Sequence, residues 1–255
     1  MSSPPHDPAP RPVLRLDWCS HAAAKYAVEH WHYSRRMPLG PMVHIGVWEQ
    51  GRFIGAVLFA RGNTPTLGQR YGLPMTQVCE LVRVALDRHQ TPVSRIVSVA
   101  LRMLTKHCPG LRLVVSFSDP AWRHLGGIYQ AGNWIYTGES TAEFQFYHDG
   151  RWKHRREITS GAFGGTRKVA DYSMLPKRLM AGKHRYLYPL DAAMRAQIAP
   201  LARPYPKRLG PTGVDSDTAP DQGAEAGAHP SVGLHAHSYQ WEVANGRTLS
   251  GTVPD

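Results

Sequence analysis

The feature of this sequence that most constrains its fold is an alternation of strand-like and helix-like segments between two polar ends. A first helix is expected to begin after Ser20, a favourable N-cap residue, and to run to about His30. The segments after it are predicted, in order, as β-β-β-α-β-α-β-β. This order favours a mixed sheet with helices on its faces, so we predict an α/β fold with its core in residues 13–150.

Three β-rich runs precede the second predicted helix. Residues 43–48 and 53–60 are joined by a short turn in which Gly51 supplies a positive φ, as in a β-hairpin. Residues 78–86 form the third run, and Ser94 is expected to open the amphipathic helix that follows. The apolar side of that helix consists of Ile96, Val97, Ala100, Leu101 and Leu104.

The second half of the predicted core begins with a nearly continuous apolar strand over residues 111–117, which ends just before Asp119. A short helix over 122–131 and strands over 134–136 and 143–147 complete the order. Because ligands sit at the carboxyl ends of strands in open α/β sheets, the end of this apolar strand is a candidate site.

Charge and composition separate the ends of the chain from this core. Residues 1–12 contain five prolines, and residues 209–255 are mainly small and polar, so both ends are predicted to be disordered. The second of these ends holds six acidic residues against one basic residue, so the net charge of +11 is concentrated in the rest of the chain. Such a field attracts polyanions, nucleic acid first, although it could also serve solubility alone.

A basic extension is expected to complete the domain over residues 151–208. Its first part, 151–188, has ten Lys or Arg residues interleaved with Trp and Tyr, a composition that suits DNA, although it could equally be a solvated face. The candidates for contacts to the DNA backbone are Arg151, Lys153, Arg155, Arg156, Arg167, Lys168, Lys177 and Arg178.

Cysteine usage and hydropathy indicate the compartment. Cys19, Cys79 and Cys108 show no CxxC spacing and are odd in number, as expected in a reducing cytoplasm. No apolar stretch is long enough to cross a bilayer, and the first residues lack the order of a signal peptide. We therefore expect a cytoplasmic protein without a membrane partner.

Three segments carry residue types that suit chemistry. The helix start at Ser94, with Arg83 and Arg95 nearby in sequence, could bind a phosphate or could be an ordinary helix cap. Asp119, at the end of the apolar strand and ten residues before Tyr129, could face a ligand or could cap a helix. His32 could serve as a base or metal ligand beside them, or could pack as a buried histidine.

Two resemblances add to these observations. The hairpin, the run ELVRVALD at 80–87 and the Ser-initiated helix resemble the GNAT acetyltransferase fold, in which the pantetheine of acetyl-CoA pairs with the corresponding strand and the pyrophosphate meets the next helix. More narrowly, residues 13–190 resemble the Mom proteins of phages. The motifs that carry this likeness are HWHYS at 30–34, SFSD at 116–119, GGIYQAGNWIYTG at 126–138 and KHRYLYPL at 183–190.

The resemblance to Mom implies an enzyme that converts adenine in DNA to an N6-carbamoylmethyl form, which protects the DNA from restriction. It implies acetyl-CoA as a cofactor and double-stranded DNA, with a flipped adenine, as a partner; iron is a further expectation. The residues it points to are His32, Tyr33, Asp119 and Tyr129 for the reaction, Arg83, Val84, Ser94 and Arg95 for the coenzyme, and His32, Asp119 and Tyr129 for the iron. The product contains an amide nitrogen that an acetyl group does not supply.

Two other functions remain open at the level of the sequence. The same fold could be an N-acetyltransferase that acts on a small amine or a protein, in which case DNA would stay unaltered. A DNA-binding accessory protein without catalysis would bind DNA in a salt-sensitive manner and would change nothing chemically. The basic segment with its interleaved aromatic residues fits the first of these two poorly.

Overall fold

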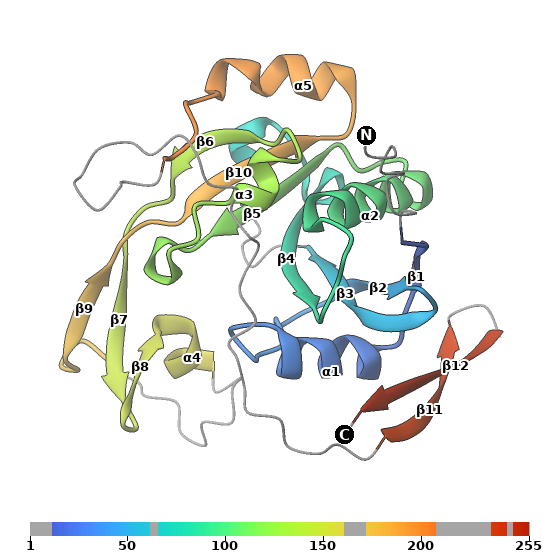
Figure 1. Cartoon of the computed structure of the whole chain (residues 1–255). Coiled ribbons are helices and arrows are strands. Elements are labelled where there is room, and N and C mark those ends of the chain that lie inside the picture. Colours follow the sequence, from blue (N-terminus) through green and yellow to red (C-terminus); the bar gives the residue numbers. More distant parts are fainter. Residues whose placement is uncertain (1–11, 62–65, 161–171, 208–235, 244–246, 255) are drawn as a thin grey trace, which may run out of the picture.

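The computed structural model describes residues 12–61, 66–160, 172–207, 236–243 and 247–254, and its centre is a seven-stranded sheet (Figure 1). The strand order is β1-β2-β3-β4-β5-β10-β6, and β4 and β5 form the parallel pair in an otherwise antiparallel sheet. The strands are β1 (Leu14–Trp18), β2 (Met42–Glu49), β3 (Arg52–Ala60), β4 (Val78–Leu86), β5 (Leu113–Ser118), β10 (His184–Pro189) and β6 (Ile135–Glu139). The mixed α/β fold predicted from the sequence is confirmed.

Helices cover both faces of this sheet. The first helix, α1 (His21–Trp31), begins at Ser20, whose hydroxyl accepts a hydrogen bond from the backbone of Ala23. Its small buried residues pack on one face, against Ala56 and Leu58 of β3. The longest helix, α2 (Val93–His107), packs on the opposite face, because alternate residues of a strand point to opposite sides.

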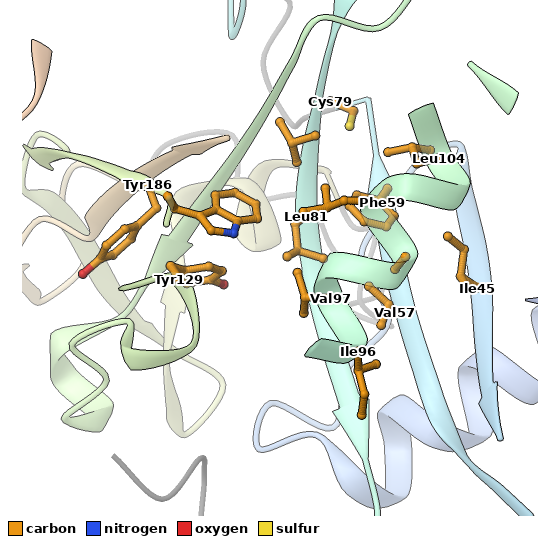
Figure 2. Close-up of a cluster of buried hydrophobic side chains, with 14 of the residues drawn as sticks. Ile45, Val57, Phe59, Cys79, Leu81, Ile96, Val97, Leu104, Tyr129 and Tyr186 are labelled. Carbon is orange, nitrogen blue, oxygen red and sulfur yellow. The ribbon is translucent and has the colours of Figure 1, made fainter. Parts of the chain in front are cut away.

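The apolar side of α2 is the one that the sequence predicts. Ile96, Val97, Ala100, Leu101 and Leu104 are all buried. Figure 2 shows Ile96 and Val97 beside Leu81 of β4, whereas Tyr129 and Tyr186 lie together on the other side of that strand. The core therefore has an aliphatic part under α2 and an aromatic part toward β10.

The beginning of α2 differs from the prediction. Pro92 is the N-cap residue and Ser94 lies inside the first turn, so the hydroxyl of Ser94 makes no capping hydrogen bond. Proline suits this place because its fixed φ is compatible with the helix start and it has no N–H to satisfy. The Ser94 hydroxyl is consequently free of a capping role.

The segment after β5 also differs from the single helix expected over 122–131. It forms a 3-10 turn, η3 (Pro120–Trp122), and a short helix, α3 (Gly127–Gln130). Arg123 and Gly126 between them have φ values of 57° and 79°, a left-handed conformation that ends a helix. The break matters because it brings the residues around Trp122 close to the carboxyl end of β5.

The basic extension is the part of the fold that the sequence predicts least well. It supplies β10, which lies between β5 and β6 in the main sheet, with Tyr186 and Leu187 completely buried. It also forms most of a second, three-stranded sheet, which consists of β7 (Glu143–His148), β8 (Arg151–His154) and β9 (Lys177–Met180). The helices α4 (Arg155–Ser160) and α5 (Ala192–Ile198) and the 3-10 turn η4 (Ala199–Leu201) also belong to the extension, whereas the 3-10 turns η1 (Gln69–Tyr71) and η2 (Met75–Gln77) lie between β3 and β4.

The C-terminal region, for which the sequence predicts disorder, contains two described strands. Residues 236–243 and 247–254 form a hairpin of two strands, β11 (Ala236–Val243) and β12 (Arg247–Pro254), in a sheet of their own. The other residues predicted to be disordered, 1–11 and 209–235, lie outside the described part of the chain. Within the described residues no helix combines the length and apolarity that crossing a membrane would require.

Strands β4 and β5 separate after a short parallel ladder. They pair from Val78 to Leu81 on β4, and the remaining half of β4 has no strand partner on that side among the described residues. On its other side, β4 carries one extra residue, Val82, because Leu58 of β3 pairs with Arg83 and Phe59 pairs with Leu81. This bulge and the separation leave backbone groups of β4 open at the carboxyl end of the sheet.

Close contact between β3 and β4 depends on Gly55. This residue has a φ of 143°, and a Cβ atom there would overlap the carbonyl oxygen of Ala85. We expect Gly55→Ala to lower the free energy of unfolding by about 3 kcal/mol or more, since backbone strain and a backbone clash add. Urea unfolding measures this change, with Gly51→Ala as a control at which a Cβ meets no neighbour. Equal losses in the two variants would contradict the explanation.

Candidate active site

Four aromatic side chains gather where β5 ends and the segment after α1 crosses the sheet. We call His32, Tyr33, Trp122 and His124 the ring cluster. Tyr33 is its centre, with its ring centroid 4.2 Å from that of His32, 5.4 Å from that of Trp122 and 5.1 Å from that of His124. Residues that are about 90 positions apart in the sequence therefore form one group of rings.

His32 is buried and held in one tautomer by Ser34. The backbone N–H of Ser34 donates to Nδ1 of His32 at 3.1 Å, so the proton of the neutral ring is on Nε2. Burial, followed by the charges of Arg83 and His124, lowers the pKa of His32 from 6.5 to about 3. At neutral pH His32 is therefore an uncharged hydrogen-bond donor through Nε2, and it is poorly suited to act as a base.

The lowered pKa of His32 makes a prediction for stability. His32 has a pKa near 6.5 in the unfolded chain and of about 3 in the folded protein. Its contribution to the free energy of unfolding is complete above pH 6.5 and is lost as the pH falls toward 3. Between pH 7 and pH 5 the free energy of unfolding should fall by about 2 kcal/mol more in the wild type than in His32→Gln. Urea unfolding of both proteins at the two pH values measures this, and parallel losses would contradict it.

Arg83 brings a positive charge into the ring cluster. Its guanidinium donates to the carbonyl oxygens of Val82 at 2.7 Å and of Arg36 at 3.3 Å, and none of the ion pairs among the described residues includes it. Burial lowers its pKa, whereas the nearby Tyr33, Glu80 and Tyr129 act in the opposite direction and raise it. The structure thus places Arg83 beside His32, Tyr33 and Tyr129, while its predicted contact to the coenzyme stays a prediction.

Tyr129 lies under the ring cluster and is hydrogen bonded to Ser116. The two hydroxyl oxygens are 2.8 Å apart, and the Ser116 hydroxyl donates to the carbonyl oxygen of Leu81 at 2.8 Å. Since a serine hydroxyl has a single proton, Tyr129 donates its own proton to Ser116. Burial raises the pKa of Tyr129 to about 12, so the side chain is a neutral phenol at neutral pH.

Asp119 stands at the end of β5, as predicted, and has two roles in the fold. One carboxylate oxygen accepts the backbone N–H of Ala121 and so caps η3, and the other lies 3.5 Å from the ammonium group of Lys183. The interpretation of this residue as a cap is therefore confirmed, and its role as a site residue stays a prediction. Its charge raises the pKa of Tyr33, which shows that it is electrostatically coupled to the ring cluster.

The predicted coenzyme residues fall in two places. Ser94 and Arg95 line a cavity of about 380 Å³ together with Ser98, the turn after α3, Tyr188 and Arg195. Val84, in contrast, packs against the apolar core from the open half of β4. Two hydroxyls and two guanidinium groups around one cavity form an environment that suits phosphate groups.

The residues expected to bind iron do not form a ready ligand set. In the described part of the chain no three His, Cys, Asp or Glu side chains are grouped for a metal. Tyr129 keeps its proton, and Nε2 of His32 carries one because Nδ1 accepts from Ser34. Asp119 is engaged with Ala121 and Lys183. We therefore derive no step through a metal.

The predicted DNA contacts are only partly available. Lys153 is buried and lies 2.6 Å from the carboxylate of Asp149, so it is not free to meet a phosphate. Arg155, Lys177 and Arg178 are exposed, while Arg151 is half-buried near Glu157. The side chain of Arg156 lies outside the described residues, as do Arg167 and Lys168 entirely.

Two of the exposed cations, Lys177 and Arg178, belong to the sheet of β7, β8 and β9, and Arg155 begins α4 beside it. We call this sheet together with α4 the basic wing. Arg178 covers the ring of Trp152 at 4.6 Å and Lys177 covers that of Phe144 at 5.3 Å. An ion pair of 3.0 Å between Arg36 and Glu157 of α4 joins this region to the segment that follows Tyr33. Figure 1 shows the wing next to the main sheet.

Sequence reasoning missed several residues of this site. Ser116, Trp122, His124 and Lys183 all contact predicted site residues. The hydroxyl of Ser118 is buried without a hydrogen-bond partner among the described residues. Ser116 and Ser118 could have been predicted from the sequence, because they are two residues apart in an otherwise apolar strand. This spacing places both side chains on the face of the sheet that Tyr129 contacts.

An open strand edge, a cation-lined cavity and a cluster of titratable side chains at the carboxyl end of the sheet define an α/β protein with an enzyme-type site. The chain belongs to the Mom protein family, which it matches over residues 13–207. It is 29% identical over 205 residues to the methylcarbamoylase Mom of Escherichia phage Mu, and the match covers 76% of this chain and 84% of that protein.

Solved structures with a similar chain course are acyl-transferring enzymes with little sequence identity. One is FeeM, an N-acyl amino acid synthase from uncultured soil microbes, with a TM-score of 0.38, 13% identity, and coverage of 75% of this chain and 97% of that chain. Another is the spermidine/spermine N-acetyltransferase SpeG from Vibrio cholerae, with a TM-score of 0.40, 10% identity, and coverage of 73% and 96%.

Proposed function

We propose that this protein modifies adenine in DNA at N6 and produces the carbamoylmethyl form. Membership of the Mom family and the similarity to a methylcarbamoylase support this activity. The single structural observation that carries the proposal is the meeting of His32, Tyr33, Arg83, Asp119 and Tyr129 from four separate segments at the open end of β4 and β5. Residues that serve folding alone would not need two tyrosines, a histidine and an arginine with shifted pKa values in one place.

Acetyl-CoA fits the arrangement of this chain. The open half of β4 offers backbone groups for an extended pantetheine arm, and Ser94, Arg95 and Arg195 line a cavity that suits its phosphates. When bound, the thioester would supply the two carbons of the carbamoylmethyl group. Joining its methyl carbon to N6 in place of a hydrogen also requires a two-electron oxidant, and replacing the thiol by an amide requires a nitrogen donor, both from other molecules. The carbon unit would have to lie near the bulge at Val82, because the open strand edge begins there.

Asp119 is the residue best placed to take a proton from the adenine amino group. N6 is a weak nucleophile because its lone pair is shared with the ring, so loss of a proton as a bond forms would assist it. The carboxylate oxygen near Lys183 would accept this proton, since the other oxygen caps η3. Lys183 is half-exposed and 3.5 Å away, and can be displaced by an incoming base.

Arg83 and His32 would act as fixed donors around the reacting atoms, with Tyr129, whose proton is donated to Ser116, packed beneath them. Arg83 is charged, while His32 and Tyr129 are neutral at neutral pH. Negative charge that develops in the transition state is stabilised best by donors that are already in place and shielded from water. In these roles Arg83, His32 and Tyr129 do not have to bind a metal ion.

DNA would be held by the basic wing with the target base turned out of the duplex. N6 of a paired adenine is out of reach of a pocket, so the base has to leave the stack. Arg155, Lys177 and Arg178 would contact phosphates, which gives affinity with little sequence information. The ion pair between Arg36 and Glu157 would keep the wing in register with the ring cluster.

Restriction digestion tests this proposal. DNA isolated from cells that express the protein should resist enzymes that cut at adenine-containing sites, and DNA from cells that express Asp119→Ala should be cut. Full sensitivity of both DNAs, together with an acetylated small amine or protein, would instead identify an N-acetyltransferase. Salt-sensitive DNA binding without any chemical change would identify an accessory protein.

A further inference from the structure

Trp122 is the most exposed member of the ring cluster, and the proposed chemistry leaves it without a role. It is 57% exposed although its ring lies 5.4 Å from that of Tyr33, which is itself 46% exposed. Single exposed aromatic residues are common on protein surfaces. Here, however, the two adjoining rings are both exposed, and Tyr33 lies close enough to Arg83 and Asp119 for both charges to act on its hydroxyl.

The backbone around Trp122 is fixed by the same carboxylate that would react. Asp119 caps the turn through the backbone N–H of Ala121, and its own carbonyl accepts from Trp122 at 3.1 Å and from His124 at 3.3 Å. Arg123 completes the turn with a φ of 57°, which is unfavourable for a residue with a side chain and persists only where surrounding contacts impose it. The ring is thus presented from a rigid turn next to Asp119.

The charges near Trp122 indicate the class of ligand. Arg123, the next residue in the chain, is exposed, and Lys183 is half-exposed next to Asp119. Aromatic rings that are surrounded by cations are the pattern with which proteins bind unpaired nucleotides, since the rings stack on bases and the cations meet phosphates. An apolar peptide or a lipid tail would gain nothing from these charges.

We propose that Trp122 is the platform on which the flipped purine stacks, with Tyr33 as the wall behind it. This inference rests on the proposed function and assigns a base-binding residue to the same site. The rings of Tyr33 and Trp122 already contact each other, so the base lies on the open face of Trp122 and not between the two. Because Asp119 caps the turn that carries Trp122, a base stacked there lies beside the carboxylate.

The test compares the affinity of the protein for two DNA duplexes. One contains a single adenine opposite an abasic site, so that this base leaves the stack at little cost, and the other has abasic sites on both strands. The wild type should bind the first duplex roughly tenfold more tightly, which is the size expected for stacking of one base. Trp122→Ala should bind both duplexes equally, and Trp122→Phe should keep most of the preference.

Controls separate stacking from other effects. Trp122 has no charge, so Trp122→Ala keeps the contacts to the phosphates, which are the same in both duplexes. The salt dependence of binding should therefore be unchanged in this variant. Leu201→Ala removes another exposed apolar side chain, away from the ring cluster, and should keep the full preference. Because Trp122 is exposed, its replacement should hardly alter the thermal unfolding temperature, and Trp122→Gln serves as a second variant without a ring.

The outcomes of this experiment are independent of the chemical reaction. A wild type that modifies DNA but binds both duplexes equally would overturn the role of Trp122 and leave the proposed function intact. Retention of the preference in both Trp122→Ala and Trp122→Gln would also overturn it. A preference that depends on Trp122, in a protein that leaves adenine unmodified, would support the stacking site and count against the proposed function.

Discussion

Replacing Asp119 with asparagine is expected to lower the rate of adenine modification by at least 100-fold. A positioned acid or base contributes about 10²- to 10⁴-fold to a rate, and asparagine cannot accept the proton of the adenine amino group. The amide oxygen can still accept the backbone N–H of Ala121, so the turn and the fold should be preserved. The measurement is the initial rate at which modified deoxyadenosine appears, with purified protein at saturating DNA.

A second variant distinguishes the role of Asp119 as a base from its pairing with Lys183. Lys183→Met removes the ammonium group that lies 3.5 Å from the carboxylate and leaves the carboxylate itself in place. We expect this change to alter the rate by less than about tenfold, because a half-exposed ion pair contributes little. Similar losses in both variants, or a rate for Asp119→Asn within a few-fold of the wild type, would contradict the assignment.

Arg83→Met should reduce activity by about 100-fold or more with little change in stability. The guanidinium is a pre-positioned positive charge at the reacting centre, and its loss removes stabilisation of the transition state. Its burial is costly and its partners are main-chain carbonyls, so an apolar side chain of similar length should be tolerated by the fold. Kinetics and urea unfolding of the same preparation measure both effects.

Arg112 offers a matched control for Arg83. Its guanidinium forms two hydrogen bonds with the carboxylate of Asp191, at 2.8 Å and 3.0 Å, and lies away from the ring cluster. Arg112→Met should therefore lower stability and leave the rate of modification unchanged. An Arg83→Met protein that is unfolded, or one that is folded and fully active, would show that Arg83 serves the fold alone.

Patterns of local origin were predicted well from the sequence. The hairpin of β2 and β3, the bounds of β4 and the apolar side of α2 are all where the periodicity places them. Each depends on side chains within a few residues of one another, such as the positive φ values at Gln50 and Gly51 that close the hairpin. Local rules therefore suffice for these elements.

Elements whose formation depends on distant partners were not predicted. The strand β10 is short and begins with His184 and Arg185, so the buried pair Tyr186 and Leu187 is hidden in a basic segment. Its place between β5 and β6 is decided by pairing with both neighbours. Tertiary context overrides local propensity in such strands.

The same distinction applies to the site. His32, Asp119 and Tyr129 were chosen from motifs, and the structure brings their segments together around Tyr33. The tautomer of His32 and the protonated state of Tyr129 could not be predicted, because a hydrogen bond from Ser34 sets the first and burial in the folded protein sets the second. Trp122 was expected inside a helix, and the left-handed residue Arg123 is what presents it at the surface instead.

Mass spectrometry of nucleosides tests the central claim most directly. DNA from cells that express the wild-type protein should contain deoxyadenosine heavier by one carbamoylmethyl group in place of an N6 hydrogen, and this species should vanish in cells that express Asp119→Asn. Deoxyadenosine of ordinary mass in cells with abundant, folded wild-type protein would contradict the account, as would a modified species that persists without the carboxylate.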